Sequence, residues 1–243
     1  MLKTSAAVSI GGIVGRFGSS VSKNKDESIV PKGAYSCLVK HGQAKRDKLF
    51  SWAVLSVADG ANEIRAQLEE IKEKFKYRTE LKYSSNDRYK EEVSKEFINF
   101  FIKSGMVIDV LMFQGDAKKL RSISPMKYQQ KMIEAFGNLR SMEINSKDLV
   151  MKVENQFGPS RKFKESVMVE HGFSMVLGMG KFDVMLQLND LISGIVHGFI
   201  SGNEPKSRVR KAVNDYFGER FGVKYGSWVD MIGKNIRIKY FEI

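Results

Sequence analysis

Cysteine is almost absent from this sequence, which contains Cys37 alone among its 243 residues. An internal disulfide is therefore excluded, and we expect the reducing environment of the cytoplasm. The three histidines, at positions 41, 171 and 197, have no cysteine partners at zinc-finger spacing. A structural zinc site of the Cys/His type is therefore not expected.

Long apolar runs are also missing, as are the motifs of two common kinds of site. No uninterrupted apolar stretch approaches the roughly 20 residues that span a bilayer, so we expect no membrane-spanning segment. No Gly-x-Ser-x-Gly motif occurs and the histidines are dispersed, which argues against a serine-hydrolase triad. The glycine-rich stretch from Gly11 to Gly18 lacks the Gly-Lys-Ser/Thr ending of a phosphate-binding loop.

Positive charge, in contrast, is abundant. The 40 Lys and Arg residues exceed the 28 Asp and Glu residues, which gives a formal net charge of +12 and a pI near 9.6. Polyphosphate backbones attract such a surface because neutralised phosphates release counterions. The composition therefore favours a nucleic acid partner, although a merely basic soluble enzyme has the same charge, and an anionic membrane is a weaker alternative.

The N-terminal segment differs from the rest in composition. Residues 1–25 contain four cations, five serines and no acid. Organellar transit peptides and flexible leaders share this composition. We expect residues 1–33 to form a glycine- and serine-rich basic extension, and residues 34–243 to form one α/β domain.

Beyond the extension, strand-like and helix-like segments alternate, which is typical of an α/β layered sheet. Apolar and β-branched runs predict strands at 34–40, 49–57, 106–113, 149–153 and 236–241, the first two as a hairpin. Helical spacing of apolar residues predicts helices at 61–76, 87–104, 124–142, 182–202 and 205–221. A short extended piece is expected at 79–83.

Acidic residues inside apolar segments are the features most suggestive of chemistry. Asp109 interrupts a buried-type strand, Glu154 follows another, and Asp183 and Asp190 lie about two turns apart on the long apolar helix. Buried carboxylates are costly unless they are paired or bind a cation. Several carboxylates together would suit Mg²⁺ or Mn²⁺, which can activate water against a phosphodiester. The alternative is that these acids cap helices, pair with lysines or face solvent.

Two segments carry a resemblance to a known family. Glu80-Leu81-Lys82 and the run from Leu186 to Gly194, Leu-Gln-Leu-Asn-Asp-Leu-Ile-Ser-Gly, resemble the Glu-x-Lys and Leu-Gln-x-Ala-Asp-Leu-Ile motifs of the domain-of-unknown-function 3800 family. The similarity lies in order and spacing across roughly residues 34–200. Members of that family open with a strand ending in Asp-Glu-Ser-Gly, whereas here the strand at 34–40 runs into His41-Gly42 without an acid.

The resemblance implies a ribonuclease-H-like mixed sheet flanked by helices and a metal-dependent nuclease, often found in mobile-element or phage-defence systems. It assigns Glu80 and Asp190 to a Mg²⁺ or Mn²⁺ site and Lys82 to the substrate phosphate. Asp109 or Glu154 would then complete the metal site in place of the missing N-terminal aspartate.

A second candidate surface lies on the helix predicted at 205–221. Arg208, Arg210 and Lys211 fall within its first turns and are expected to contact nucleic acid backbone. The aromatic residues that follow them, Tyr216, Phe217 and Phe221, either stack on bases or, more commonly for such residues, belong to the core.

Three functions are therefore open. The first is a metal-dependent nuclease that acts on nucleic acid phosphodiesters. The second is a catalytically degenerate nucleic-acid-binding or assembly subunit of the same fold. The third is an interaction subunit, as a homo-oligomer or with another protein, whose glycine-rich leader from Gly11 to Gly18 docks on its partner.

Overall fold

The computed structural model describes residues 33–39, 48–57, 60–115, 150–154, 165, 174–202, 204–226 and 235–242. They form a mixed α/β fold, with a mixed sheet flanked by helices, as the sequence predicts. The strands are β1 (Gly33–Val39), β2 (Lys48–Val57), β3 (Val107–Gly115), β4 (Val150–Glu154), β5 (Ser174–Gly178) and β6 (Ile236–Glu242). The longer helices are α1 (Ala61–Lys74), α2 (Lys90–Lys103), α6 (Val184–Ile200) and α7 (Arg208–Phe221).

The sheet has the order β5-β4-β1-β2-β3-β6. Strands β1, β2 and β3 form an antiparallel meander, with β2 pairing to both neighbours. The other three strands are added in parallel: β4 beside β1, β5 beside β4, and β6 beside β3. The C-terminal strand therefore returns to the edge formed by β3, more than 100 residues earlier in the chain.

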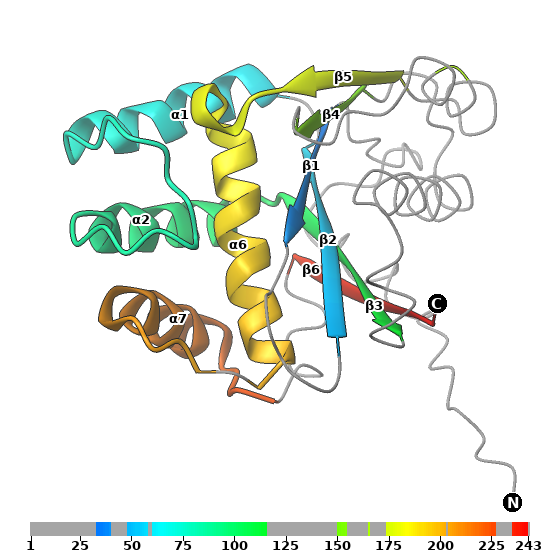
Figure 1. Cartoon of the computed structure of the whole chain (residues 1–243). Helices are drawn as coiled ribbons and strands as arrows, with labels where there is room; N and C mark the ends of the chain where they lie inside the picture. The colour runs from blue at the N-terminus through cyan, green and yellow to red at the C-terminus, as the bar shows by residue number, and fades with distance from the viewer. Residues whose placement is uncertain are drawn as a thin grey trace, which may run out of the picture.

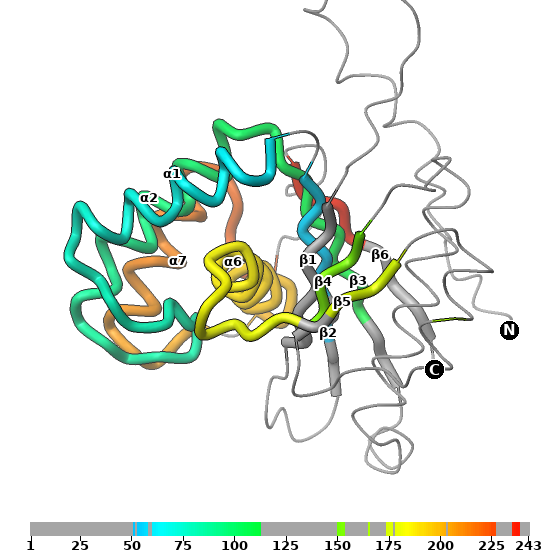
Figure 2. Tube along the Cα trace, turned by 90° about the horizontal axis from the view of Figure 1, so that it is seen from above, coloured from blue at the N-terminus to red at the C-terminus, as the bar shows by residue number. Residues whose placement is uncertain are grey.

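Helix α6 lies between the sheet and an outer layer of helices (Figures 1 and 2). It packs on β1 and β2, and α1, α2 and α7 lie side by side on its other side. Every residue of α6 is buried except Asp190 and Ile200. This position explains why the helix is apolar around most of its circumference. Of the helices that the structure describes, none has both the length and the apolarity needed to cross a bilayer.

Most of the predicted elements agree with the observed ones where the structure describes them. The hairpin, the three later strands, and the helices near 61, 87, 182 and 205 are present within a few residues. Gly105 follows α2 with φ 69°, as expected of a residue that ends a helix. The predicted helix at 124–142 lies outside the described residues, as does the extension 1–33 except for Gly33, where β1 begins.

Three local expectations are corrected. Residues 79–83 form an irregular segment rather than an extended strand, and β5 is an additional strand that the pattern did not predict. The third correction concerns Asp183, which lies at the N-cap of α6 rather than within the helix. The physical reason is that its Oδ1 accepts a hydrogen bond from the Met185 amide, 3.0 Å away, which is the usual role of aspartate at a helix start.

Candidate functional site

The two motif segments singled out in the sequence meet in the structure. The Leu81 amide donates to Gln187 Oε1 at 3.1 Å, and the Tyr83 amide donates to Asp190 Oδ2 at 2.8 Å. Both acceptors lie on α6, one turn apart. The segment Glu80–Lys82 is therefore bound along α6 by its own backbone, which places Glu80 near the helix that carries Asp190.

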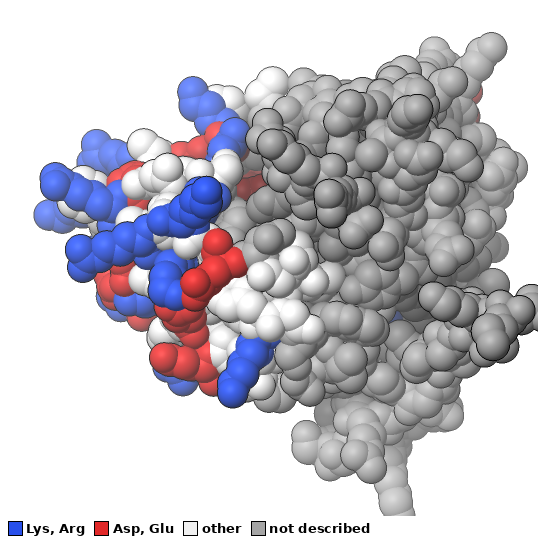
Figure 3. Space-filling model, turned by 60° about the horizontal axis from the view of Figure 1, so that its bottom comes forward, with Lys and Arg blue, Asp and Glu red and all other residues white. Residues whose placement is uncertain are grey.

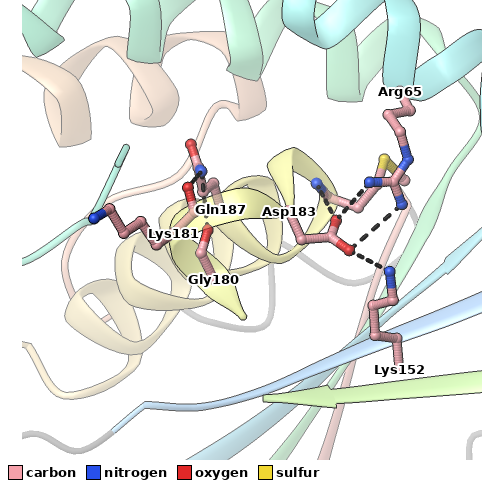
Figure 4. A network of polar contacts seen from close by, with 7 residues as sticks. Arg65, Lys152, Gly180, Lys181, Asp183 and Gln187 are labelled. Atoms are coloured by element: carbon pink, nitrogen blue, oxygen red, sulfur yellow. Dashed lines mark hydrogen bonds and ion pairs between the residues drawn. The ribbon is translucent and has the colours of Figure 1, made fainter. Parts of the chain in front are cut away.

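The Gln187 side chain makes most of the hydrogen bonds of this contact, although no role was predicted for it. Its Oε1 also accepts from Lys72 Nζ at 3.0 Å, and its Nε2 donates to the carbonyls of Gly180 and Lys181 at 2.9 and 3.3 Å (Figure 4). The amide thus joins α1, the segment before α6 and the irregular segment at 79–83. Its exposed fraction is 3%, so these hydrogen bonds replace water that burial removes.

Glu80 and Lys82, the predicted catalytic pair, bind each other. Lys82 Nζ lies 3.2 Å from Glu80 Oε2, and both side chains are partly exposed. The pairing neutralises the carboxylate that was expected to hold a metal ion. Lys82 stays accessible to a phosphate, because half of its side chain faces solvent.

Lys90 binds the backbone of the segment that follows the Glu-x-Lys motif. Its side chain is fully buried at the start of α2, and Nζ donates to the carbonyls of Lys82 and Tyr83, each at 2.8 Å, and to that of Ser85. Burial lowers the pKa of Lys90 to about 8, and the nearby Arg210 adds to the decrease. The sequence pattern could not identify this lysine, because it resembles the solvated lysines around it.

Asp109 has a structural partner in the sheet. It lies on β3 directly opposite Arg237 of β6, whose Nε and Nη2 donate to Oδ1 and Oδ2 at 2.6 and 2.8 Å. This two-pronged ion pair satisfies a carboxylate that is 5% exposed. The ion pair with Arg237 therefore explains why Asp109 occurs within an apolar strand, and pairing with a cation was one of the two alternatives stated from the sequence.

Asp183 is likewise surrounded by cations (Figure 4). Lys152 of β4 lies 2.6 Å from Oδ2, and Arg65 of α1 lies 3.3 Å from Oδ1, while the carboxylate also caps α6. The three groups tie the sheet, α1 and the start of α6 together. The charge of Asp183 is therefore balanced by Lys152 and Arg65, and these contacts stabilise the fold.

The expected convergence of Glu80, Asp190 and Asp109 on one metal ion is not found in the described part of the chain. That part contains no group of three or more His, Cys, Asp or Glu residues arranged to hold a metal. The reason is local pairing: Glu80 binds Lys82, Asp109 binds Arg237, and Asp190 accepts from a backbone amide. Glu154 ends β4, and its side chain lies outside the described residues.

The predicted cationic surface lies on α7, at the outer layer. Arg208 and Lys211 are exposed and Arg210 is half-buried, while Lys211 pairs with Glu204 and lies 4.0 Å from Asp215. Figure 3 shows Lys and Arg side chains, with acids between them, over the helical side of the described residues. Phe217 and Phe221 are buried and stacked on each other, so they belong to the core rather than to a base-binding surface.

Neither the models of known protein families nor the curated proteins yield a match to this chain. Among solved structures, it is similar to a chain of the complex of PCNA and RNase HII from Archaeoglobus fulgidus. The two share 10% sequence identity with a TM-score of 0.39, over 77% of this chain and 89% of that one. A likeness this distant assigns neither a fold family nor a function to this chain.

Proposed function

We propose that this protein binds nucleic acid through the cationic start of α7 and does not cut it. One contrast supports this proposal. Three of the acids that a nuclease would need, Glu80, Asp109 and Asp190, are engaged by a cation or a backbone amide. In contrast, four cations and one acid occur between Glu204 and Lys211. Arg208, Arg210 and Lys211 contact phosphates in this proposal, so binding is sequence-tolerant and sensitive to salt.

The fold proposed for this function is ribonuclease-H-like, as the resemblance of the two motifs to the domain-of-unknown-function 3800 family implies. The mixed sheet with its antiparallel meander and added parallel strands is compatible with that assignment. The packing of the Glu-x-Lys segment on the α6 motif is also compatible with the two motifs forming one structural unit. A cytoplasmic setting and a mobile-element or phage-defence role are further parts of this proposal.

A metal-dependent nuclease is the second candidate, and one observation favours it. Glu80 and Asp190 come from distant parts of the sequence, yet their segments are joined by backbone hydrogen bonds. A Mg²⁺ or Mn²⁺ ion would be held by Glu80 and Asp190 with Glu154, while Lys82 contacts the scissile phosphate. When bound, the ion would supply an activated water molecule.

The two candidates separate in one assay. Labelled single- and double-stranded DNA and RNA are incubated with the protein and increasing Mg²⁺ or Mn²⁺, and both retention and cleavage are measured. The proposal predicts retention of intact strands at every metal concentration. Cleavage that disappears in Asp190→Asn, a variant that keeps an oxygen acceptor for the Tyr83 amide, would establish the nuclease instead.

A further inference from the structure

Buried polar groups without partners gather where α7 meets α6. Asn214 of α7 is 0% exposed, and neither its Oδ1 nor its Nδ2 has a hydrogen-bond partner among the described residues. The Nε of Arg210, one turn earlier, and the hydroxyl of Tyr225 are also buried and unpartnered there. Because each such group costs free energy, a cluster of them suggests a missing ligand.

These groups lie close together around Tyr83. A Cβ atom at Gly198 of α6 would lie 3.2 Å from Asn214 Nδ2 and 3.3 Å from the Tyr83 hydroxyl, so the two polar groups meet over this glycine. Burial raises the pKa of Tyr83 to about 12 and also raises the pKa of Tyr225, and the Asn214 amide opposes both increases. The Asn214 amide therefore acts on both hydroxyls as a neighbouring hydrogen-bonding group, although neither of its polar atoms has a partner at full hydrogen-bond distance and angle.

Cations and acids both lie around this cluster. Lys90 is buried nearby, and it interacts with Arg210, a second cation, and with Asp190 and Asp87. Arg210 and Asp190 also act on Tyr83. Asp87 is occupied by a hydrogen bond to the Tyr89 amide and Asp190 by one to the Tyr83 amide. Asp215 and Glu204 act on Tyr225, and Glu204 is itself paired with Lys211. The unpartnered donors include the Nε of a guanidinium group, so a ligand that accepts hydrogen bonds and carries negative charge fits them best.

We propose that Arg210, Asn214 and Tyr225 bind a phosphate group, supplied either by free phosphate or by the terminal phosphate of a nucleic acid strand. Arg210 Nε, Asn214 Nδ2 and the Tyr225 hydroxyl are donors that phosphate oxygens satisfy. Arg210 and Tyr225 are only partly buried, so the group has a route from solvent. A terminal phosphate reaches such a recess more easily than a phosphodiester within a strand does.

Inorganic phosphate is the direct probe. Calorimetric titration and thermal unfolding are measured for the full chain in phosphate and in chloride at equal ionic strength. We expect phosphate to bind and to raise the unfolding temperature. Asn214→Leu, which keeps the side-chain shape, and the milder Tyr225→Phe should each weaken phosphate binding about tenfold. Arg220→Gln, at an exposed position near the end of the same helix, is the matched control and should bind phosphate as the unaltered chain does.

Two results would overturn the site. Phosphate that neither binds nor stabilises the chain would mean that the cluster holds water alone. Binding weakened equally in Arg220→Gln and in both site variants would mean general attraction to a cationic surface. Tyr225→Phe keeps the test valid if Asn214→Leu fails to fold, because it removes one hydroxyl from a partly exposed side chain.

Oligonucleotides distinguish the two sources of phosphate, and only this part rests on the proposed nucleic acid binding. Strands with a 5′-phosphate, a 3′-phosphate or no terminal phosphate are compared. Tighter binding of a phosphorylated strand that is lost in Tyr225→Phe assigns the site to strand ends. Equal binding of all strands, with inorganic phosphate still bound, assigns it to free phosphate. Strands that fail to bind while inorganic phosphate binds contradict the proposed function and leave the site intact.

Discussion

Lys90 carries an ammonium group into the core, where the carbonyls of Lys82, Tyr83 and Ser85 accept its hydrogen bonds. These carbonyls belong to the segment that follows the Glu-x-Lys motif. The lysine thus supplies donors for backbone groups that burial would otherwise leave unpaired. Lys95 of the same helix binds only the Glu91 and Glu92 side chains and donates no such hydrogen bonds to buried carbonyls.

Replacing Lys90 by methionine should lower the free energy of unfolding by about 3 kcal/mol, because three buried carbonyls lose their donor. The effect should also depend on pH. The pKa of Lys90 is about 8 in the folded protein and 10.5 in the unfolded chain, so between these values the unfolded chain holds a proton that the folded protein has released. The contribution of Lys90 to stability therefore rises with pH across this window.

Denaturant unfolding of the unaltered chain and of Lys90→Met, at a series of pH values, checks this expectation. The difference between them should be constant below pH 8 and should increase up to 10.5. Lys95→Met is the control, since Lys95 pairs with Glu91 and Glu92 on the surface of the same helix. A difference independent of pH would show that Lys90 keeps its ordinary pKa.

Asp109 tests whether a buried acid serves the fold or a metal. Asp109→Asn removes the charge that binds Arg237 and should lower the free energy of unfolding by about 2 kcal/mol. The loss is limited because the partly exposed Arg237 side chain can be hydrated instead. The loss should be the same with Mg²⁺ as with a chelator. If Mg²⁺ stabilised the unaltered chain but not the variant, Asp109 would be a metal ligand after all.

At the scale of elements, α6 organises the described structure because it is contacted by the sheet and by the outer helices. Its two glycines admit the Tyr83 ring on the side facing the irregular segment. A Cβ atom at Gly194 would lie 2.3 Å from Tyr83 Cδ1, and one at Gly198 would lie 3.3 Å from its hydroxyl. Tyr83 is 5% exposed, so the ring has little room to withdraw.

Gly194→Ala should therefore destabilise the protein by about 3 kcal/mol, through overpacking that the buried ring cannot relieve. Gly198→Ala is the graded comparison. A Cβ atom there would lie 3.2 Å from its nearest neighbour, against 2.3 Å at Gly194, so the cost should be clearly smaller. Thermal unfolding of both variants shows which of them loses more stability. An equal or reversed order would mean that the segment at 79–83 moves easily away from α6.

For the whole molecule, periodicity and turn residues predict most of the elements, because each depends on local patterning. The mixed α/β class follows from their alternation. The strand order does not, since the return of β6 to β3 and the addition of β5 beyond β4 are decided by long-range packing. The sequence left base stacking and core packing open for Phe217 and Phe221, and the structure places both in the core while Arg208 and Lys211 of the same helix are exposed.

The candidate site was less predictable for a physical reason. A sequence pattern identifies an acid in an apolar segment, but it cannot choose between a metal and a cation as the partner. Asp109 and Arg237 are 128 residues apart and become neighbours only through strand pairing. Asn214 and Lys90 gave no signal, because their unusual burial is created by the packing of α2, α6 and α7 around Tyr83.

The salt dependence of oligonucleotide affinity is the most direct test of the central claim, which is that the cationic start of α7 binds nucleic acid. The logarithm of affinity should fall linearly with the logarithm of salt concentration, with a slope of about −0.7 for each phosphate contact to a single strand. Arg208→Gln should make the slope shallower by about one contact, while Lys103→Gln, on α2 away from this surface, should leave it unchanged. Affinity independent of salt, or a slope that Arg208→Gln does not alter, would contradict the account.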